Sequence, residues 1–149
     1  MKFKLIFLAL LFSMCSNVTQ EASKEIRVVS LSTTHTEIIQ SLEAVETLIA
    51  VDSFSEVDFP VEVIDAYTVT AEELAPLNPD VVILAFDFNG IVEGLENQEI
   101  NYVLLPPAKN FEDVYSQIET IGSLVNKKSE AFSTTRDMKI EINRILDNA

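Results

Sequence analysis

Short apolar runs alternate with amphipathic segments along most of this chain, and this alternation limits the folds that are open to it. The runs are rich in Val, Ile and Leu and span residues 27–31, 47–52, 81–85 and 101–105. Runs without a polar face are typical of strands in a parallel sheet that is covered on both sides. Helical patterns lie between them and after the last one. The sequence therefore predicts an α/β fold, a three-layer, Rossmann-like lobe with a mostly parallel sheet that ends in a long helix.

The predicted helices carry recognisable start signals. They cover residues 36–44 and 70–77, a segment that begins after Asn110, and residues 129–146. The second opens with T-A-E-E, a capping box in which Thr70 and Glu73 satisfy each other's backbone N–H groups. Asn110 is a favourable N-cap. The helix after it has an apolar stripe at helical spacing, made of Val114, Ile118, Ile121 and Val125.

The first residues have the pattern of an export signal. Lys2 and Lys4 precede the apolar stretch LIFLALLF, which is too short to span a membrane. Cys15, the only cysteine, follows and resembles the lipidated cysteine of a bacterial lipobox, although Met14 stands where that pattern has a small residue. We predict a signal peptide at residues 1–14 and a polar tether at residues 15–25. This places the protein in the periplasm or cell envelope, anchored to the membrane by lipid at Cys15, with ordinary signal cleavage as the alternative.

The charge distribution excludes one class of partner. The formal net charge is −14, and residues 28–108 contain 15 Asp and Glu but no Lys or Arg. Nucleic-acid binding needs clustered Lys and Arg to neutralise phosphates. We therefore expect no nucleic-acid partner.

Hydroxyl residues and the single histidine gather between the first strand and the first helix, in the sequence S-T-T-H from Ser32 to His35. A serine nucleophile needs a histidine base and an orienting acid, yet the chain has no G-x-S-x-G, G-x-G-x-x-G or Walker motif. One histidine and one cysteine do not make a zinc site. We expect no enzyme, no catalytic residue and no metal site. Thr33 or Thr34 is instead expected to cap the helix, with Glu37 in its first turn, and also to line a ligand cleft.

Aromatic residues lie after the predicted strands. Ligands of open α/β sheets bind at the carboxyl ends of the strands. Five aromatic residues fall at this edge: Phe54, Phe59, Tyr67, Phe86 and Phe88. They are expected either to form a flat apolar platform for a ligand or to fold back onto the sheet.

The order of these motifs resembles the N-terminal lobe of the periplasmic binding proteins that serve ABC importers of cobalamin, ferric siderophores and haem. The resemblance rests on RVVSLSTTHTEIIQSL, IAVDSFSEVDFP, TAEELAPLNPDVVILA and VLLPPAKNFEDVYSQIETIGSLVNK, and covers residues 27–128. It implies a substrate-binding component that captures a metal chelate and delivers it to an ABC permease. Residues 26–128 would be the ligand-binding lobe and residues 129–149 the helix connecting it to a second lobe, which does not follow in this sequence. Either the sequence is a fragment or another chain supplies the second half. The alternative function is a truncated lobe that acts as an extracytoplasmic interaction module without a small ligand.

The resemblance also implies roles for individual residues. Glu72 would dock on arginines of the permease, and the ligand cleft would be lined by Thr33, Thr34, Phe54, Tyr67, Phe86 and Phe88. A cleft wall without Lys or Arg disfavours a highly anionic siderophore, because buried anions need cations or donors. It suits a large, flat or weakly charged chelate such as cobalamin or haem, and the Tyr67 phenolate is an option for ligating ferric iron. No cofactor is expected besides this transported ligand.

Overall fold

The computed structural model describes residues 25–148, so the predicted signal peptide, Cys15 and nearly all of the tether lie outside the described residues. The strands are β1 (Val28–Leu31), β2 (Leu48–Asp52), β3 (Glu62–Ile64), β4 (Val81–Leu84) and β5 (Tyr102–Leu104). The α-helices are α1 (Thr33–Ser41), α2 (Ala71–Leu74), α3 (Ile91–Asn97), α4 (Phe111–Leu124) and α5 (Lys128–Leu146). Short 3₁₀ helices cover Val45–Thr47, Ala75–Leu77 and Phe88–Gly90. No helix in this part of the chain is long and apolar enough to cross a membrane.

The five strands form one sheet in the order β3-β2-β1-β4-β5, and every neighbouring pair is parallel. The four predicted strands are all present. β1 is the central strand. The chain moves outward from β1 to β2 and β3, then crosses back to β4 on the other side of β1, so the direction of winding changes between β1 and β4. In doubly wound sheets this switch point, at the carboxyl ends of the strands, is where ligands bind.

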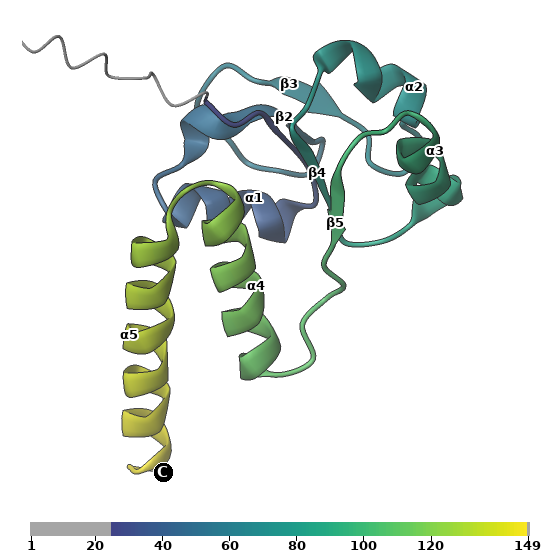
Figure 1. Ribbon diagram of the computed structural model, residues 1–149. Coiled ribbons are helices and arrows are strands. Elements are labelled where there is room, and N and C mark those ends of the chain that lie inside the picture. Colours follow the sequence, from purple (N-terminus) through teal and green to yellow (C-terminus); the bar gives the residue numbers. More distant parts are fainter. Residues whose placement is uncertain (1–24, 149) are drawn as a thin grey trace, which may run out of the picture.

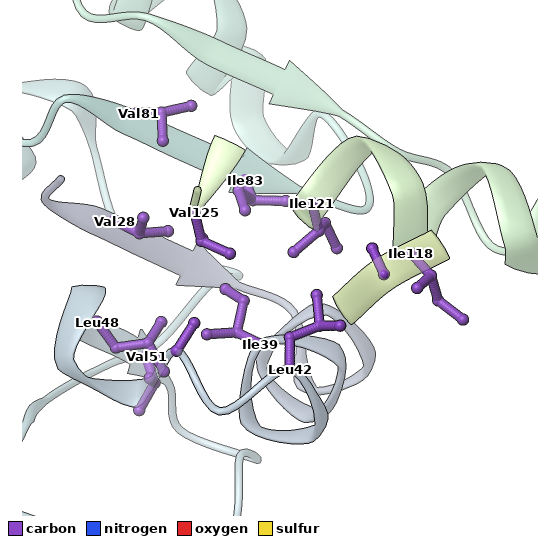
Figure 2. Packing of buried hydrophobic residues seen from close by; sticks show 12 residues of the cluster. Val28, Ile39, Leu42, Leu48, Val51, Val81, Ile83, Ile118, Ile121 and Val125 are labelled. Carbon is purple, nitrogen blue, oxygen red and sulfur yellow. The ribbon is translucent and has the colours of Figure 1, made fainter. Parts of the chain in front are cut away.

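Helices cover both faces of the sheet and make the three predicted layers (Figure 1). On one face, α1 and α4 pack on the sheet, and α5 adds Ala131 to the same buried cluster. Figure 2 shows Ile39 of α1, the C-cap residue Leu42 and Ile121 of α4 over the strand residues. On the other face, α2 and α3 contribute Leu74 and Leu95 to a second buried cluster. Alternate residues of one strand enter different clusters, as the two-residue period of a strand requires. The predicted α/β fold is confirmed.

The predicted caps at the starts of α2 and α4 are present, whereas the predicted cap of α1 was wrong. Thr70 and Glu73 form the capping box at α2, and the Asn110 side chain accepts from the Asp113 backbone N–H at α4. α1, however, begins at Thr33, with Ser32 as an N-cap that makes no side-chain capping hydrogen bond. Thr33 and Thr34 are therefore inside the first turn and are not caps, and Glu37 lies beyond that turn. The Thr33 hydroxyl is free to bond elsewhere.

Helices α1, α3 and α4 end in the same Schellman motif. In each, a residue with positive φ follows the helix, namely Glu43, Glu99 or Asn126. The next backbone N–H then bonds back across the last turn, as Lys127 does to the Gly122 carbonyl at 2.7 Å. Glycine is the usual residue at this position because a Cβ is disfavoured at positive φ. The chain accepts this strain at Glu43 and Glu99 and still turns sharply into β2 and β5.

The long helix α5 lies beside α4 and extends away from the sheet (Figure 1). Gly122 of α4 faces Ala131 of α5 so closely that a Cβ at position 122 would lie 2.4 Å from the Ala131 Cβ. Only Ala131 and Thr135 of α5 are buried. Its large apolar residues Phe132, Ile140, Ile145 and Leu146 are exposed. The helix is thus only partly covered by the rest of the described chain.

Candidate ligand-binding site

A pocket of about 250 Å³ opens at the carboxyl ends of the strands, at the switch point of the sheet. Its walls come from the ends of β1, β2 and β4 and from the segment after β3. It is lined by Leu31, Ser32, Thr33, Thr34, Asp52, Phe54, Ala66, Tyr67, Ala85, Phe86 and Phe88. All six residues expected to line the cleft are therefore brought together in one place.

Four aromatic rings form a continuous wall of this pocket. Tyr67 is central, with ring centroids 6.1 Å from Phe54 and 4.6 Å from Phe88, and Phe88 lies 5.3 Å from Phe86. The edge-to-face and tilted arrangements are those that aromatic pairs prefer. Even so, Phe54, Tyr67 and Phe86 are each about half or more exposed, at 66%, 53% and 49%. The rings therefore support one another while leaving apolar surface open to the pocket.

Phe59 does not belong to this wall. It packs, partly buried, against the core cluster under α1 and α4. The segment between β2 and β3 is long enough to fold this ring back onto the lobe. Of the two outcomes expected for the aromatic residues, Phe59 shows the second, whereas the other four rings line the pocket.

The loops that carry the aromatic residues are held by side-chain hydrogen bonds to backbone. The Asn89 side-chain amide donates to the Tyr67 carbonyl at 2.6 Å, which ties the loop after β4 to the loop after β3. Asp65 accepts from the Tyr67 N–H at 2.9 Å, and Asp87 accepts from the Val92 N–H at 3.0 Å. These bonds make the aromatic wall a preformed surface, which lowers the ordering cost of binding.

The polar part of the pocket is centred on Asp52, a residue that the sequence analysis did not single out. The Thr33 hydroxyl donates to Asp52 Oδ2 at 3.3 Å, and the Phe54 N–H lies 3.4 Å from the same oxygen. Asp52 is only 5% exposed, and its Oδ1 has no hydrogen-bond partner among residues 25–148. The available signal was an acidic residue at the end of a buried apolar run.

A larger cavity of about 680 Å³ lies beside this pocket, bounded by α1, α4 and α5. Ser32, Thr34, Ala85 and Phe86 line both cavities, so Phe86 stands between them.

His35 also lines the larger cavity. It is 2% exposed, and its Nδ1 has no partner among the described residues. Burial lowers the pKa of His35 from 6.5 to about 4, and the hydrogen bond to the Leu105 backbone offsets only part of this effect. The imidazole is therefore neutral near pH 7.

This histidine lacks the surroundings of a catalytic base. Among residues 25–148 no hydrogen bond joins it to a serine or a carboxylate, so the partners of a triad are not assembled. The same part of the chain contains no cluster of three His, Cys, Asp or Glu side chains that would hold a metal ion. Glu72 lies elsewhere, exposed in the first turn of α2 and outside the pocket.

The family of the chain follows from its sequence as a whole. Residues 28–147 match the family described as periplasmic binding protein, and the chain belongs to that family. Its members are binding proteins and not enzymes, in agreement with the expectation from the motifs. No curated protein matches the sequence.

Solved structures share the fold. A periplasmic haem-binding protein of Vibrio cholerae has 22% sequence identity and a TM-score of 0.73, with 83% of this chain and 50% of that chain covered. A possible iron-binding solute-binding protein of Staphylococcus epidermidis has 21% identity and a TM-score of 0.70, with 85% and 52% covered. A haem-binding protein of Pseudomonas aeruginosa has 20% identity and a TM-score of 0.69, with 81% and 46% covered. The chain thus spans about half the length of these proteins.

Proposed function

We propose that this chain is the substrate-binding component of an ABC importer, which captures a metal chelate outside the cytoplasm and delivers it to a permease. The observation that carries the proposal is the preformed aromatic wall of Phe54, Tyr67, Phe86 and Phe88 at the switch point of the sheet. Membership in the periplasmic binding protein family supports it. The fold shared with haem-binding and iron-binding proteins supports the choice of a metal chelate.

The residues around the pocket favour a flat or weakly charged chelate such as cobalamin or haem. Exposed aromatic faces stack on a planar macrocycle. Residues 28–108, which supply the whole pocket, contain no Lys or Arg to compensate a multiply charged anion. Tyr67 has its ring in the centre of the wall and adds the option of a phenolate ligand to ferric iron.

The same proposal assigns a role to each part of the chain. We assign residues 26–128 to the ligand-binding lobe and residues 129–149, which include most of α5, to the segment that would connect it to a second lobe. The partly covered apolar residues of α5 fit this role. One lobe covers only part of a ligand, so we expect the isolated chain to bind weakly. We expect a Kd in the micromolar range or higher, which corresponds to a binding free energy of about 8 kcal/mol or less in magnitude.

Titration of haem and cobalamin against the purified chain tests the function. We expect at least one macrocycle to bind, and Phe88→Ala to weaken this binding about tenfold, since a lost aromatic contact costs about 1 kcal/mol or more. Phe132→Ala is the matched control, because Phe132 is an exposed phenylalanine on α5, away from the pocket. Tyr67→Phe separates stacking from iron ligation and should affect haem alone. Tight binding of an anionic ferric siderophore, with neither macrocycle bound, would refute the proposed ligand class.

We propose further that Glu72 contacts arginines of the permease. It is exposed at the start of α2, which follows the loop that carries Tyr67. Glu72→Lys should abolish co-purification with the permease and leave ligand binding unchanged. Glu93→Lys is the matched control, because Glu93 is an exposed acid in the first turn of α3. Equal loss of co-purification in both variants would show that net charge, and not a Glu72 contact, controls docking.

The location follows from the first residues. We propose export across the inner membrane, removal of residues 1–14 and lipidation of Cys15, which would hold the protein at the membrane surface. A triacylated cysteine anchors firmly, whereas one acyl chain does not. Mass spectrometry of the mature N-terminal peptide decides the point, since an unmodified cysteine at that position is incompatible with the anchor.

A further inference from the structure

We infer that Asp52 is a specificity-determining residue of the aromatic pocket, and that the pocket prefers a chelate that presents an ammonium or another N–H donor to this carboxylate. The inference rests on the proposed function and narrows its ligand class. It concerns a residue whose burial and unpaired oxygen are seen only in the folded chain.

The first support is the unsatisfied hydrogen-bonding capacity of Asp52. Its Oδ2 accepts from the Thr33 hydroxyl and the Phe54 N–H at 3.3 and 3.4 Å, both long for hydrogen bonds to a carboxylate. Its Oδ1 is buried without a partner among the described residues. A carboxylate has about four acceptor positions, and a buried polar atom without a partner is unfavourable. A ligand donor that reaches the Asp52 carboxylate from the pocket would add the hydrogen bond that these long contacts leave room for.

The second support is position. Asp52 ends β2, next to the central strand, and lines the pocket together with Phe54 and Tyr67. A chelate stacked on those rings would place its edge beside the carboxylate. In this partly desolvated place, a charge acts more strongly than it would at an open surface.

The third support is the charge of the surroundings. The loops after β3 and β4 each carry a further carboxylate, Asp65 and Asp87. Asp65 accepts from the Tyr67 N–H in its own loop, and Asp87 accepts from the Val92 N–H in the first turn of α3. Residues 28–108 contain no Lys or Arg to compensate any of these charges. Asp52 is thus the charged residue of the pocket lining, and no Lys or Arg lines the pocket, so an anionic ligand group would be disfavoured there and a cationic one favoured.

Two probes that differ only in the donor isolate the effect. Ferrioxamine B carries a free ammonium at the end of its chain, and its N-acetyl derivative holds the same iron chelate with that charge removed. We expect the wild-type chain to bind ferrioxamine B about tenfold more tightly than the acetylated form at low salt, measured by calorimetry. Asp52→Asn should reduce this ratio to about one. Asp58 is an exposed acid in the segment that follows β2 and does not line the pocket, so Asp58→Asn should preserve the tenfold preference.

The outcomes distinguish a failure of the Asp52 role from a failure of the proposed importer function. A wild-type ratio near one, or a preference for the acetylated form, overturns the role of Asp52 even if Asp52→Asn fails to fold. Equal ratios in wild type and a folded Asp52→Asn variant overturn it as well. If haem or cobalamin binds but neither ferrioxamine does, the importer proposal stands and this inference fails. If none of the four chelates binds, the proposed function fails and the inference falls with it.

Discussion

Replacing Gly122 by alanine is expected to destabilise the protein by about 2 kcal/mol, although alanine is the better helix former. The new Cβ would lie 2.4 Å from the Ala131 Cβ and 3.0 Å from the Lys127 carbonyl oxygen. Overpacking of this kind costs about 1–3 kcal/mol or more, and exceeds the gain of up to about 1 kcal/mol in helix propensity. Because the contact joins α4 to α5, we expect α5 to move away from α4. Urea unfolding of wild type and Gly122→Ala measures the difference in the free energy of unfolding.

A second substitution tests whether the close approach is the cause. Ala131→Gly in the Gly122→Ala background removes the nearer contact and should restore part of the lost free energy of unfolding, while the contact with the Lys127 carbonyl remains. Ser123→Ala, an exposed neighbour in α4, controls for the added helix propensity and should be neutral or slightly stabilising. A Gly122→Ala protein as stable as wild type would show that the two helices pack less tightly than the structure has them.

The second large effect is a loss of stability in acid, caused by His35. Its pKa is about 4 in the folded protein against 6.5 ordinarily, because burial disfavours the charged imidazole. As pH falls through 6.5 the unfolded chain takes up a proton that the folded chain does not take up until about pH 4. The unfolded state binds more protons in this window, so stability falls as pH falls. A pKa difference of this size corresponds to about 3 kcal/mol of stability, which is fully present above pH 6.5 and has been lost by about pH 4.

The measurement compares unfolding of wild type and His35→Gln from pH 7.5 to pH 4. Carboxylates titrate in both proteins, so the difference between the two curves isolates the histidine. We expect His35→Gln to lose less stability on acidification than wild type, with the gap opening below pH 6.5. Parallel curves would mean that the imidazole is not held neutral in the folded protein.

The layered architecture could be predicted from the amino-acid sequence alone. Apolar runs without a polar face and amphipathic segments between them led to the parallel sheet and its two helical layers, because burial on two faces leaves a direct mark on composition. Start signals were equally legible at Thr70 and Asn110, where the capping partners lie within three residues of one another. Two elements were not predicted from the sequence, the strand β3 and the helix α3. β3 is three largely exposed residues at the sheet edge, and α3 is short and contains Gly94, so neither has a strong periodic signal.

The composition of the site was decided only by tertiary structure. The parallel topology explains why four aromatic residues from three loops meet, and this much followed from their positions after strands. Whether a ring joined that wall or the core depended on loop paths, which is why Phe59 went to the core while Phe54 stayed at the pocket. Asp52 and His35 became notable for the same reason. Burial and missing partners are properties of the folded surroundings, and a linear sequence does not record which atoms lie within hydrogen-bonding distance of a side chain.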